Sequence, residues 1–229
     1  MIPLKDENPS QTTPVVTLLL IAVNTLLFFY QVSLGPQDRA FVFRFGAIPD
    51  ELFHQVQSSR STGLALQITV LTSMFLHGGF LHLAGNMLYL WIFGNNVEDV
   101  MGHGRFILFY LICGSIAVYT HAFFNSDSTV PMIGASGAIS GVLGAYLLLF
   151  PHARIWTLVT LGFFIQFVDL PAVVVLGFWV VMQILYGLFS FSGPAEGVAW
   201  FAHIGGLFAG MALVWPFKKR AGRRFNNWG

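Results

Sequence analysis

Six long apolar segments, separated by short polar stretches, dominate the pattern of this chain. They cover residues 14–34, 80–95, 106–124, 136–150, 171–191 and 200–215. A helix of about 20 apolar residues, with about 17 to 25 as the usual range, spans the hydrocarbon core of a bilayer. The pattern therefore predicts six membrane-spanning helices, of which the second, fourth and sixth are short.

The fourth and sixth segments are also rich in glycine and alanine. Gly137 with Gly141, and Gly206 with Gly210, form pairs of small residues about one helical turn apart. Such pairs allow two helix backbones to approach closely. We therefore expect these two helices to pack against each other at the centre of the bundle.

Two stretches do not fit the simple series of spans. Residues 35–79 form a long loop with semi-apolar pieces, which we expect to lie partly in the membrane interface. Residues 154–167 are apolar and β-branched, and Asp169 and Pro171 follow them. This second stretch is compatible with a lead-in to the fifth helix or with an extra interfacial turn.

The composition agrees with a membrane protein. Hydrophobic residues make up 55% of the 229 residues and charged residues only 9%, far below the roughly one quarter that is charged in soluble domains. The fold predicted is an all-α transmembrane bundle in a single domain over residues 1–229, with a polar N-terminus (1–13) and a basic tail (217–229). The first apolar segment exceeds the core of a cleaved signal, so we expect a retained anchor. A net charge of +1 argues against nucleic acid as a partner, and the single cysteine, Cys113, excludes an intrachain disulfide.

Lysine and arginine predict the orientation. The tail "KKRAGRR" follows the last segment, and the positive-inside rule places it in the cytoplasm, together with the N-terminus if there are six spans. The expected inner loops carry Arg105 and Arg154, whereas the outer loops 125–135 and 192–199 carry no lysine or arginine. The long first loop has three arginines on the outer side, but long loops translocate largely regardless of charge. The N-terminal residues show no Arg-rich transit pattern, so we expect a bacterial inner membrane.

In this topology the second, fourth and sixth helices all begin at the outer face. Ser136 opens the fourth helix and His203 lies about one turn into the sixth, while His82 and Asn86 share one face of the second. These polar side chains therefore share one depth below the outer surface. Polar groups inside membrane helices are costly and by default indicate a functional site.

The residue types suit acyl transfer. A serine becomes a nucleophile when a base, most often histidine, removes its proton, so Ser136 and His203 are the minimum pair. The oxyanion that forms needs fixed donors, which His82, Asn86 and the backbone N–H of Ser136 can supply. The glycines beside Ser136 allow a substrate to approach the hydroxyl.

Each residue also has a structural interpretation. A serine in a Gly-rich membrane helix is more often a packing residue, and Ser140, one turn further on, is a rival nucleophile. The esterase pattern GxSxG is not met, because Ala138 occupies its last position. We interpret His121 as interfacial, and His77 and His103 as loop residues.

Three motifs together resemble the rhomboid family of intramembrane serine proteases. They are "GASG" at residues 134–137 for the family's GxSG, His203 with Gly206 and Gly210 for its HxxGxxxG, and His82 to Asn86 for its HxxxN. The stretches "NVEDVMGHGRFILFYL" and "FRFGAIPDELF" extend the resemblance over nearly the whole chain.

The resemblance implies a six-helix fold and a catalytic dyad of Ser136 and His203 without an acidic third member or a cofactor. It also implies an oxyanion site of His82, Asn86 and the Ser136 backbone, lined by Gly134. The implied substrates are single-span membrane proteins, cut where their helix unwinds in the lipid bilayer. Some family members carry a tyrosine where this chain has Ser140, so what orients His203 is left open. The resemblance suggests that the fifth helix and the loop 192–199 admit substrate.

Three other functions are less favoured by the sequence. A non-catalytic binder would hold membrane clients in the same cleft, although such relatives usually lack the nucleophile or the base. A metal or haem site could use His82 and His203, with His77, but no carboxylate or cysteine completes it and we expect no metal. A transporter is disfavoured because the halves show no inverted repeat. The sequence assigns no oligomeric state.

Overall fold

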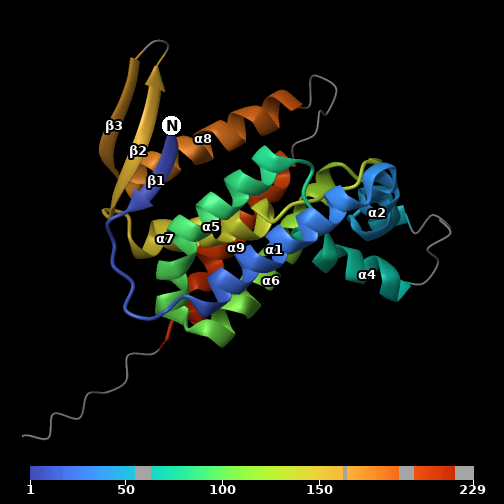
Figure 1. Cartoon of the computed structure of the whole chain (residues 1–229), viewed down its shortest axis with the longest axis horizontal. Helices are drawn as coiled ribbons and strands as arrows, with labels where there is room; N and C mark the ends of the chain where they lie inside the picture. The colour runs from blue at the N-terminus through green and yellow to red at the C-terminus, as the bar shows by residue number, and fades with distance from the viewer. Residues whose placement is uncertain (55–62, 162–163, 191–198, 220–229) are drawn as a thin grey trace, which may run out of the picture.

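The computed structural model is mostly helical and describes residues 1–54, 63–161, 164–190 and 199–219 (Figure 1). The helices are α1 (Val15–Ser33), α2 (Asp38–Phe45), α3 (Pro49–His54), α4 (Gly63–Thr72), α5 (Phe80–Met101), α6 (His103–Phe124), α7 (Ser136–Leu149), α8 (Ala172–Ser190) and α9 (Trp200–Phe217). Short 3-10 turns cover Gly35–Gln37 and Ser73–Phe75, and the strands are β1 (Ile2–Asp6), β2 (Arg154–Leu161) and β3 (Phe164–Pro171). The predicted loop 192–199 and basic tail fall largely outside the described residues.

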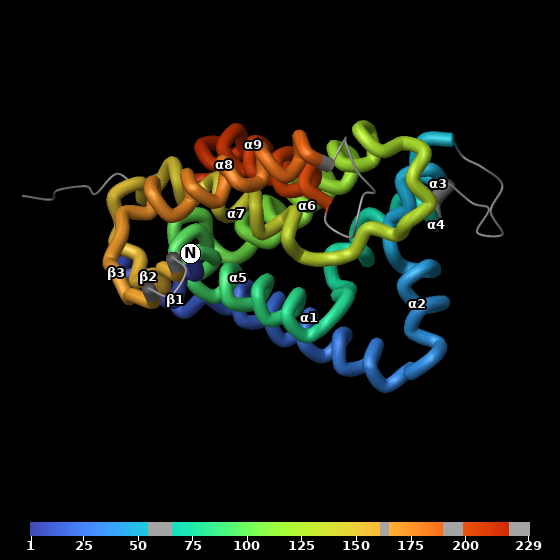
Figure 2. Tube along the Cα trace, turned by 90° about the horizontal axis from the view of Figure 1, so that it is seen from above, coloured from blue at the N-terminus to red at the C-terminus, as the bar shows by residue number. Residues whose placement is uncertain are grey.

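Helix α7 forms the centre of the bundle. Every residue from Gly137 to Tyr146 is buried, and Figure 2 shows the helix between α5 and α9. Its most extensive contact is with α9. At that contact the backbone of Gly206 lies against the carbonyl of Gly137, and the backbone of Gly210 lies against the carbonyl of Gly141. A side chain at Gly206 or Gly210 would collide with this backbone, so the small residues set the helix separation.

Four helices are long and apolar enough to cross a membrane, namely α1, α6, α8 and α9. A fifth span results if Leu66–Phe75 and α5, which meet at a bend of 84°, are counted together. Helix α7 has only 14 residues and falls short of the usual spanning length. The structure thus supports four or five candidate spans among the described residues, and the count of six stays a prediction.

The region 35–79, predicted as a long loop, contains α2, α3 and α4. These helices are short, from 6 to 10 residues, and they lie at one end of the molecule in both views (Figures 1 and 2). Ile68 and Leu71 of α4 are exposed. That exposure agrees with the expectation that the region lies partly in the interface, which stays a prediction.

The all-α prediction is wrong at the other end of the molecule, where the strands form an antiparallel sheet in the order β1-β2-β3 (Figure 1). Residues 154–167 are therefore neither a helical lead-in to α8 nor a turn, because β2 and β3 pair as antiparallel strands. Their location in the membrane interface stays a prediction. The burial along β2 alternates, with Ile155 and Thr157 buried and Trp156 exposed, as expected for a strand. Strand β1 lies in the segment predicted as a polar N-terminus and pairs with the other edge of β2.

A hydrogen bond joins this sheet to the central helix. The Tyr146 hydroxyl in α7 donates to Asp6 Oδ2 in β1 over 3.0 Å. Burial raises the pKa of the Asp6 carboxyl above its ordinary value, while this hydrogen bond opposes the rise. The sheet is thus fixed near the end of α7 that is remote from Ser136.

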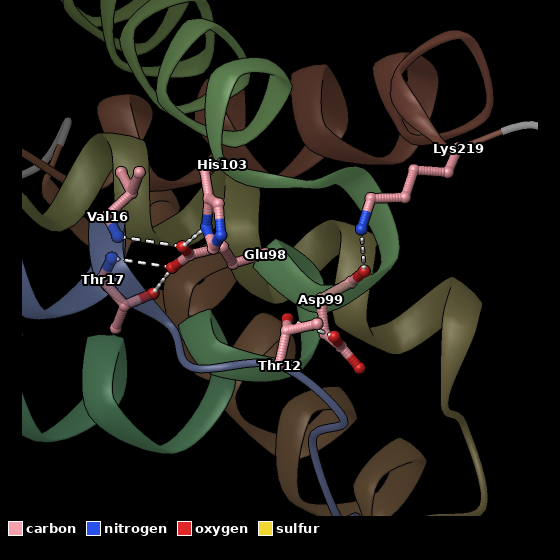
Figure 3. A network of polar contacts seen from close by, with 7 residues as sticks. All are labelled: Thr12, Val16, Thr17, Glu98, Asp99, His103 and Lys219. Atoms are coloured by element: carbon pink, nitrogen blue, oxygen red, sulfur yellow. Dashed lines mark hydrogen bonds and ion pairs between the residues drawn. The ribbon is translucent and has the colours of Figure 1, made fainter.

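A buried carboxylate holds α1 against α5 (Figure 3). Glu98 has no exposed surface and accepts hydrogen bonds from the backbone N–H groups of Val16 and Thr17 and from the Thr17 hydroxyl, at 2.7–2.9 Å. Because those N–H groups open α1, Glu98 caps that helix from a different helix. His103 Nδ1 lies 2.5 Å from the same carboxylate, and His103 begins α6 rather than lying in a loop as predicted.

The next residue, Asp99, joins the segment before α1 and the segment after α9 to α5 (Figure 3). Its carboxylate accepts from the Gln11 backbone N–H at 2.9 Å and from the Thr12 hydroxyl at 2.5 Å. The Lys219 ammonium donates to the Asp99 carbonyl at 3.2 Å. The predicted second span ends at residue 95, so Glu98 and Asp99 lie outside it.

Candidate active site

A cavity of about 900 Å³ opens between the N-terminal ends of α5, α7 and α9. Residues of α6, α8 and the segment 128–133 complete its wall. The residues predicted to form a site from separate helices all line it, namely His82, Asn86, Ser136 and His203. Trp179, Tyr186, Trp200 and Phe201 supply aromatic surface.

Ser136 and His203 contact each other through their side chains in this cavity. Ser136 is the first residue of α7, and its Oγ lies 2.8 Å from Nε2 of His203, in the first turn of α9. Gly137 directly follows Ser136, and Gly206 lies about one turn after His203. The contact between these two glycines holds the two helix ends together. A hydroxyl at this distance from an imidazole nitrogen can donate its proton to that nitrogen.

Ser140, the rival nucleophile, is engaged elsewhere. Its side chain is 1% exposed, and its hydroxyl donates to the backbone carbonyl of Ser136 over 2.7 Å. This is the usual bond of a serine to the carbonyl four residues earlier in a helix. The geometry therefore favours Ser136, which is partly exposed to the cavity, as the reactive hydroxyl.

The ring of His82 is fixed by the turn that precedes α5. The backbone N–H of Gly78 donates to His82 Nδ1 over 3.3 Å, so the ring proton of a neutral His82 resides on Nε2. A Cβ on Gly134 would lie 2.8 Å from Nε2 and 3.7 Å from Ser136 Oγ. Gly134 also has a φ of 126°, which disfavours any other residue. The glycine thus leaves the Nε2–H of His82 facing the space beside Ser136.

Asn86 offers a second donor to the cavity. Its side chain is 7% exposed, and its Nδ2 is buried without a hydrogen-bond partner in the part of the chain that the structure describes. A buried donor without a partner costs about 1 to 3 kcal/mol, which is a reason to expect a functional role. The backbone N–H of Ser136 opens α7 and has no carbonyl in a preceding turn. These groups can together stabilise an oxyanion.

The second ring nitrogen of His203 contacts a residue that the sequence analysis did not select. His203 Nδ1 lies 2.6 Å from Oε1 of Gln183, a buried residue of α8. Trp179 and Trp200 flank the same imidazole, with ring centroids 6.0 and 6.1 Å away. The signal that could have found Gln183 is a lone side-chain amide in an otherwise apolar spanning helix.

The remaining histidines near the cavity show no metal-binding arrangement. His77 lies in the turn before α5 as predicted, is buried, and packs edge-on against His82 with centroids 5.1 Å apart. His121, predicted as interfacial, lines the cavity from the end of α6. Within the described ranges, no three His, Cys, Asp or Glu residues come together in a way that could hold a metal ion.

Comparison with known proteins matches this chain to one protein family. A family model described as a rhomboid domain matches residues 66–220. Rhomboid protease GluP of Bacillus subtilis is 35% identical over 215 residues, which are 92% of this chain and 37% of that protein. Rhomboid protein 1, mitochondrial, of Saccharomyces cerevisiae is 33% identical over 164 residues, which are 67% of this chain and 42% of that protein. The chain thus spans about two fifths of the length of these relatives.

Proposed function

The chain belongs to the rhomboid family, and from that premise we propose that it is an intramembrane serine endopeptidase with Ser136 as nucleophile and His203 as general base. The observation that carries the proposal is the 2.8 Å contact between Ser136 Oγ and His203 Nε2 inside a cavity between membrane helices. The name of the relative in Bacillus subtilis, a rhomboid protease, supports the same reaction class.

In the first step, Ser136 Oγ attacks the carbonyl carbon of the substrate peptide bond while its proton passes to His203 Nε2. The carbonyl π electrons move to the oxygen, which becomes an oxyanion. The tetrahedral intermediate then collapses, the C–N bond breaks, and the imidazolium gives the proton to the leaving amine. An acyl ester on Ser136 and a free amine result.

The oxyanion is held by three donors in this proposal. They are Nε2–H of His82, Nδ2–H of Asn86 and the backbone N–H of Ser136. The first is supported by the Gly78 hydrogen bond to His82 Nδ1 and the second by the absence of a partner for Asn86 Nδ2 among the described residues. Fixed donors of this kind stabilise the transition state without reorganising when charge develops.

In the second step, water attacks the acyl ester, and its proton passes to His203 Nε2 as the C–O bond forms. The intermediate collapses, the Ser136 oxygen leaves, and it takes the proton back. A cavity of about 900 Å³ offers space for water as well as for an extended substrate segment.

The proposed substrates are single-span membrane proteins in the surrounding lipid bilayer. A peptide bond in an intact helix is shielded by its backbone hydrogen bonds, so a segment must unwind before attack. The lining of the cavity supports this, because the aromatic side chains of Trp179 and Trp200 stand beside the polar site and can contact apolar substrate residues.

We further propose a single domain with six spans, in a bacterial inner membrane with both termini in the cytoplasm. Basic residues lie at the end of the bundle remote from Ser136, which supports this orientation. Arg105 donates to the Lys218 carbonyl at 3.1 Å, and Lys219 contacts Asp99 at the same end of α5. The cavity would then face the outer side.

Cleavage of a fluorogenic transmembrane peptide in detergent tests the proposed activity. The wild type and Ser140→Ala should cleave it, whereas Ser136→Ala and His203→Ala should lose at least about a thousandfold in rate. Cleavage that persists in Ser136→Ala would refute the assignment. A folded wild type that binds the peptide without cutting it would instead support the non-catalytic alternative.

A further inference from the structure

The imidazole of His203 contacts protein groups through both of its ring nitrogens. Nε2 lies 2.8 Å from Ser136 Oγ, and Nδ1 lies 2.6 Å from Gln183 Oε1. A neutral imidazole carries one N–H, so one nitrogen donates and the other accepts. Which nitrogen carries the proton decides whether Ser136 can be activated.

Only one of the two tautomers suits a general base. If Nδ1 carries the proton and donates to Gln183 Oε1, the lone pair of Nε2 faces Ser136 and can accept its proton. In the other tautomer Nε2–H would point at Ser136 Oγ and could not take a proton from it. An amide oxygen at 2.6 Å from Nδ1 therefore selects the competent form.

Resting on the proposed function, we infer that Gln183 is a positioning residue that completes the Ser136–His203 pair by holding His203 in this tautomer and orientation. It acts through His203 and does not touch substrate. The expected dyad thus has a third member, which is neutral rather than acidic and comes from α8 instead of from α7 or α9.

The placement of Gln183 in α8 supports this role. The helix is otherwise apolar, and its neighbours Ile184 and Leu185 are exposed at 40% and 41%, whereas Gln183 is buried. An amide buried in such a helix is costly unless it has a polar partner. His203 is that partner, so packing alone does not account for a glutamine at this position.

Gln183 also stabilises the His203 imidazolium that forms after proton transfer. The imidazolium carries N–H groups on both nitrogens, and the one on Nδ1 keeps its acceptor in Gln183 Oε1. The amide oxygen therefore stabilises the charged form at the moment when it is needed. Trp179 and Trp200 enclose the ring, which limits its access to water as an alternative partner.

The experiment compares Gln183→Met, which keeps the length of the side chain but removes the acceptor, with Gln183→Glu, which keeps an acceptor and adds charge. Ile184→Met is the matched control on the exposed face of α8. The readout is the rate at which a fluorophosphonate probe labels the full-length protein in detergent across pH. This rate needs an activated serine but no known substrate.

We expect Gln183→Met to slow labelling by about tenfold or more, the worth of one net hydrogen bond, and Ile184→Met to label like the wild type. We expect Gln183→Glu to label, with its half-maximal rate on the acid side moved to higher pH, because a carboxylate favours the imidazolium more than an amide does. If the side chain at position 183 did not face Nδ1 of His203, the added carboxylate would move the pH profile little.

Unchanged or faster labelling of Gln183→Met, or an unshifted profile for Gln183→Glu, overturns this inference while leaving the proposed function intact. If Gln183→Met does not fold, the nearly isosteric Gln183→Glu decides alone. A folded wild type that does not label, or a Ser136→Ala protein labelled like the wild type, overturns the proposed function and the role of Gln183 with it.

Discussion

Gly206 of α9 packs so closely on Gly137 of α7 that its backbone lies against the carbonyl of that residue, one turn from His203. The same packing brings His203 to Ser136, because Gly137 directly follows the serine. One contact therefore sets both the separation of the two helices and the distance between Ser136 Oγ and His203 Nε2.

Replacing this glycine should damage activity beyond its effect on stability. The Cβ of Gly206→Ala must displace α7 from α9, and a shift of about 1 Å in a catalytic pair can cost about a hundredfold in rate. Overpacking should also cost about 1 to 3 kcal/mol of stability. Gly177→Ala in α8 is the control, because a Cβ there meets nothing within 4 Å. Equal cleavage rates for the two folded variants would speak against the packing argument.

Asn86→Leu should separate activity from stability. The amide nitrogen of Asn86 is buried and lacks a partner in the described chain, so the folded protein loses no hydrogen bond from that nitrogen when it is removed. We expect the thermal midpoint to stay the same or rise. The cleavage rate should fall by about a hundredfold to a thousandfold with little change in KM, as for the loss of an oxyanion donor. A lowered midpoint with an unchanged rate would assign Asn86 a structural role instead.

Glu98→Gln should lower stability while leaving activity nearly unchanged. The buried carboxylate accepts from two backbone N–H groups and a hydroxyl at the start of α1, and an amide can replace it only in part (Figure 3). We expect a loss of about 2 kcal/mol or more in stability, while the rate per folded molecule changes little because Glu98 lies far from the cavity. Thermal unfolding in detergent measures this, with the exposed Glu7→Gln as control. A thermal midpoint equal to that of the control would show that the hydrogen bonds of Glu98 to the start of α1 do not stabilise the fold.

Asp6 predicts a pH dependence of stability. Burial raises its pKa above the ordinary 3.8, so the folded protein holds the proton more tightly than the unfolded chain does. The stability that the protonated Asp6 carboxyl contributes is fully present below pH 3.8, and it is lost as the pH rises through the raised pKa. The amide of Asp6→Asn cannot ionise. As the pH rises, the thermal midpoint of this variant should therefore increase relative to that of the wild type. A difference between the two proteins that stays constant with pH would contradict this expectation.

The sequence predicted those parts of the fold that have a local signal. Long apolar runs predicted α1, α6, α8 and α9 within a few residues, because burial in a membrane needs no distant partner. Strand β1 was missed, since Ile2–Asp6 is short and becomes a strand only by pairing with residues more than 140 positions away. A local pattern carries no information on that pairing.

Prediction of the site residues was also limited to what local motifs indicate. Motif order and shared depth were enough to select Ser136, His203, His82 and Asn86 as candidates, and the structure places all of them at one cavity. Sequence could not separate Ser136 from Ser140, because the choice depends on where α9 packs. Glu98 was missed because the apolar run ends before the helix does. Gln183 was missed because it belongs to none of the three motifs and lies within a long apolar run.

The most direct test of the account is to map the serine that a fluorophosphonate modifies. Wild type, Ser140→Ala and His203→Ala proteins are treated in detergent, digested, and examined by mass spectrometry. The account predicts an adduct on Ser136 in the wild type and in Ser140→Ala, and none in His203→Ala, because the hydroxyl needs its base. An adduct on Ser140, or an undiminished adduct on Ser136 without His203, would contradict it.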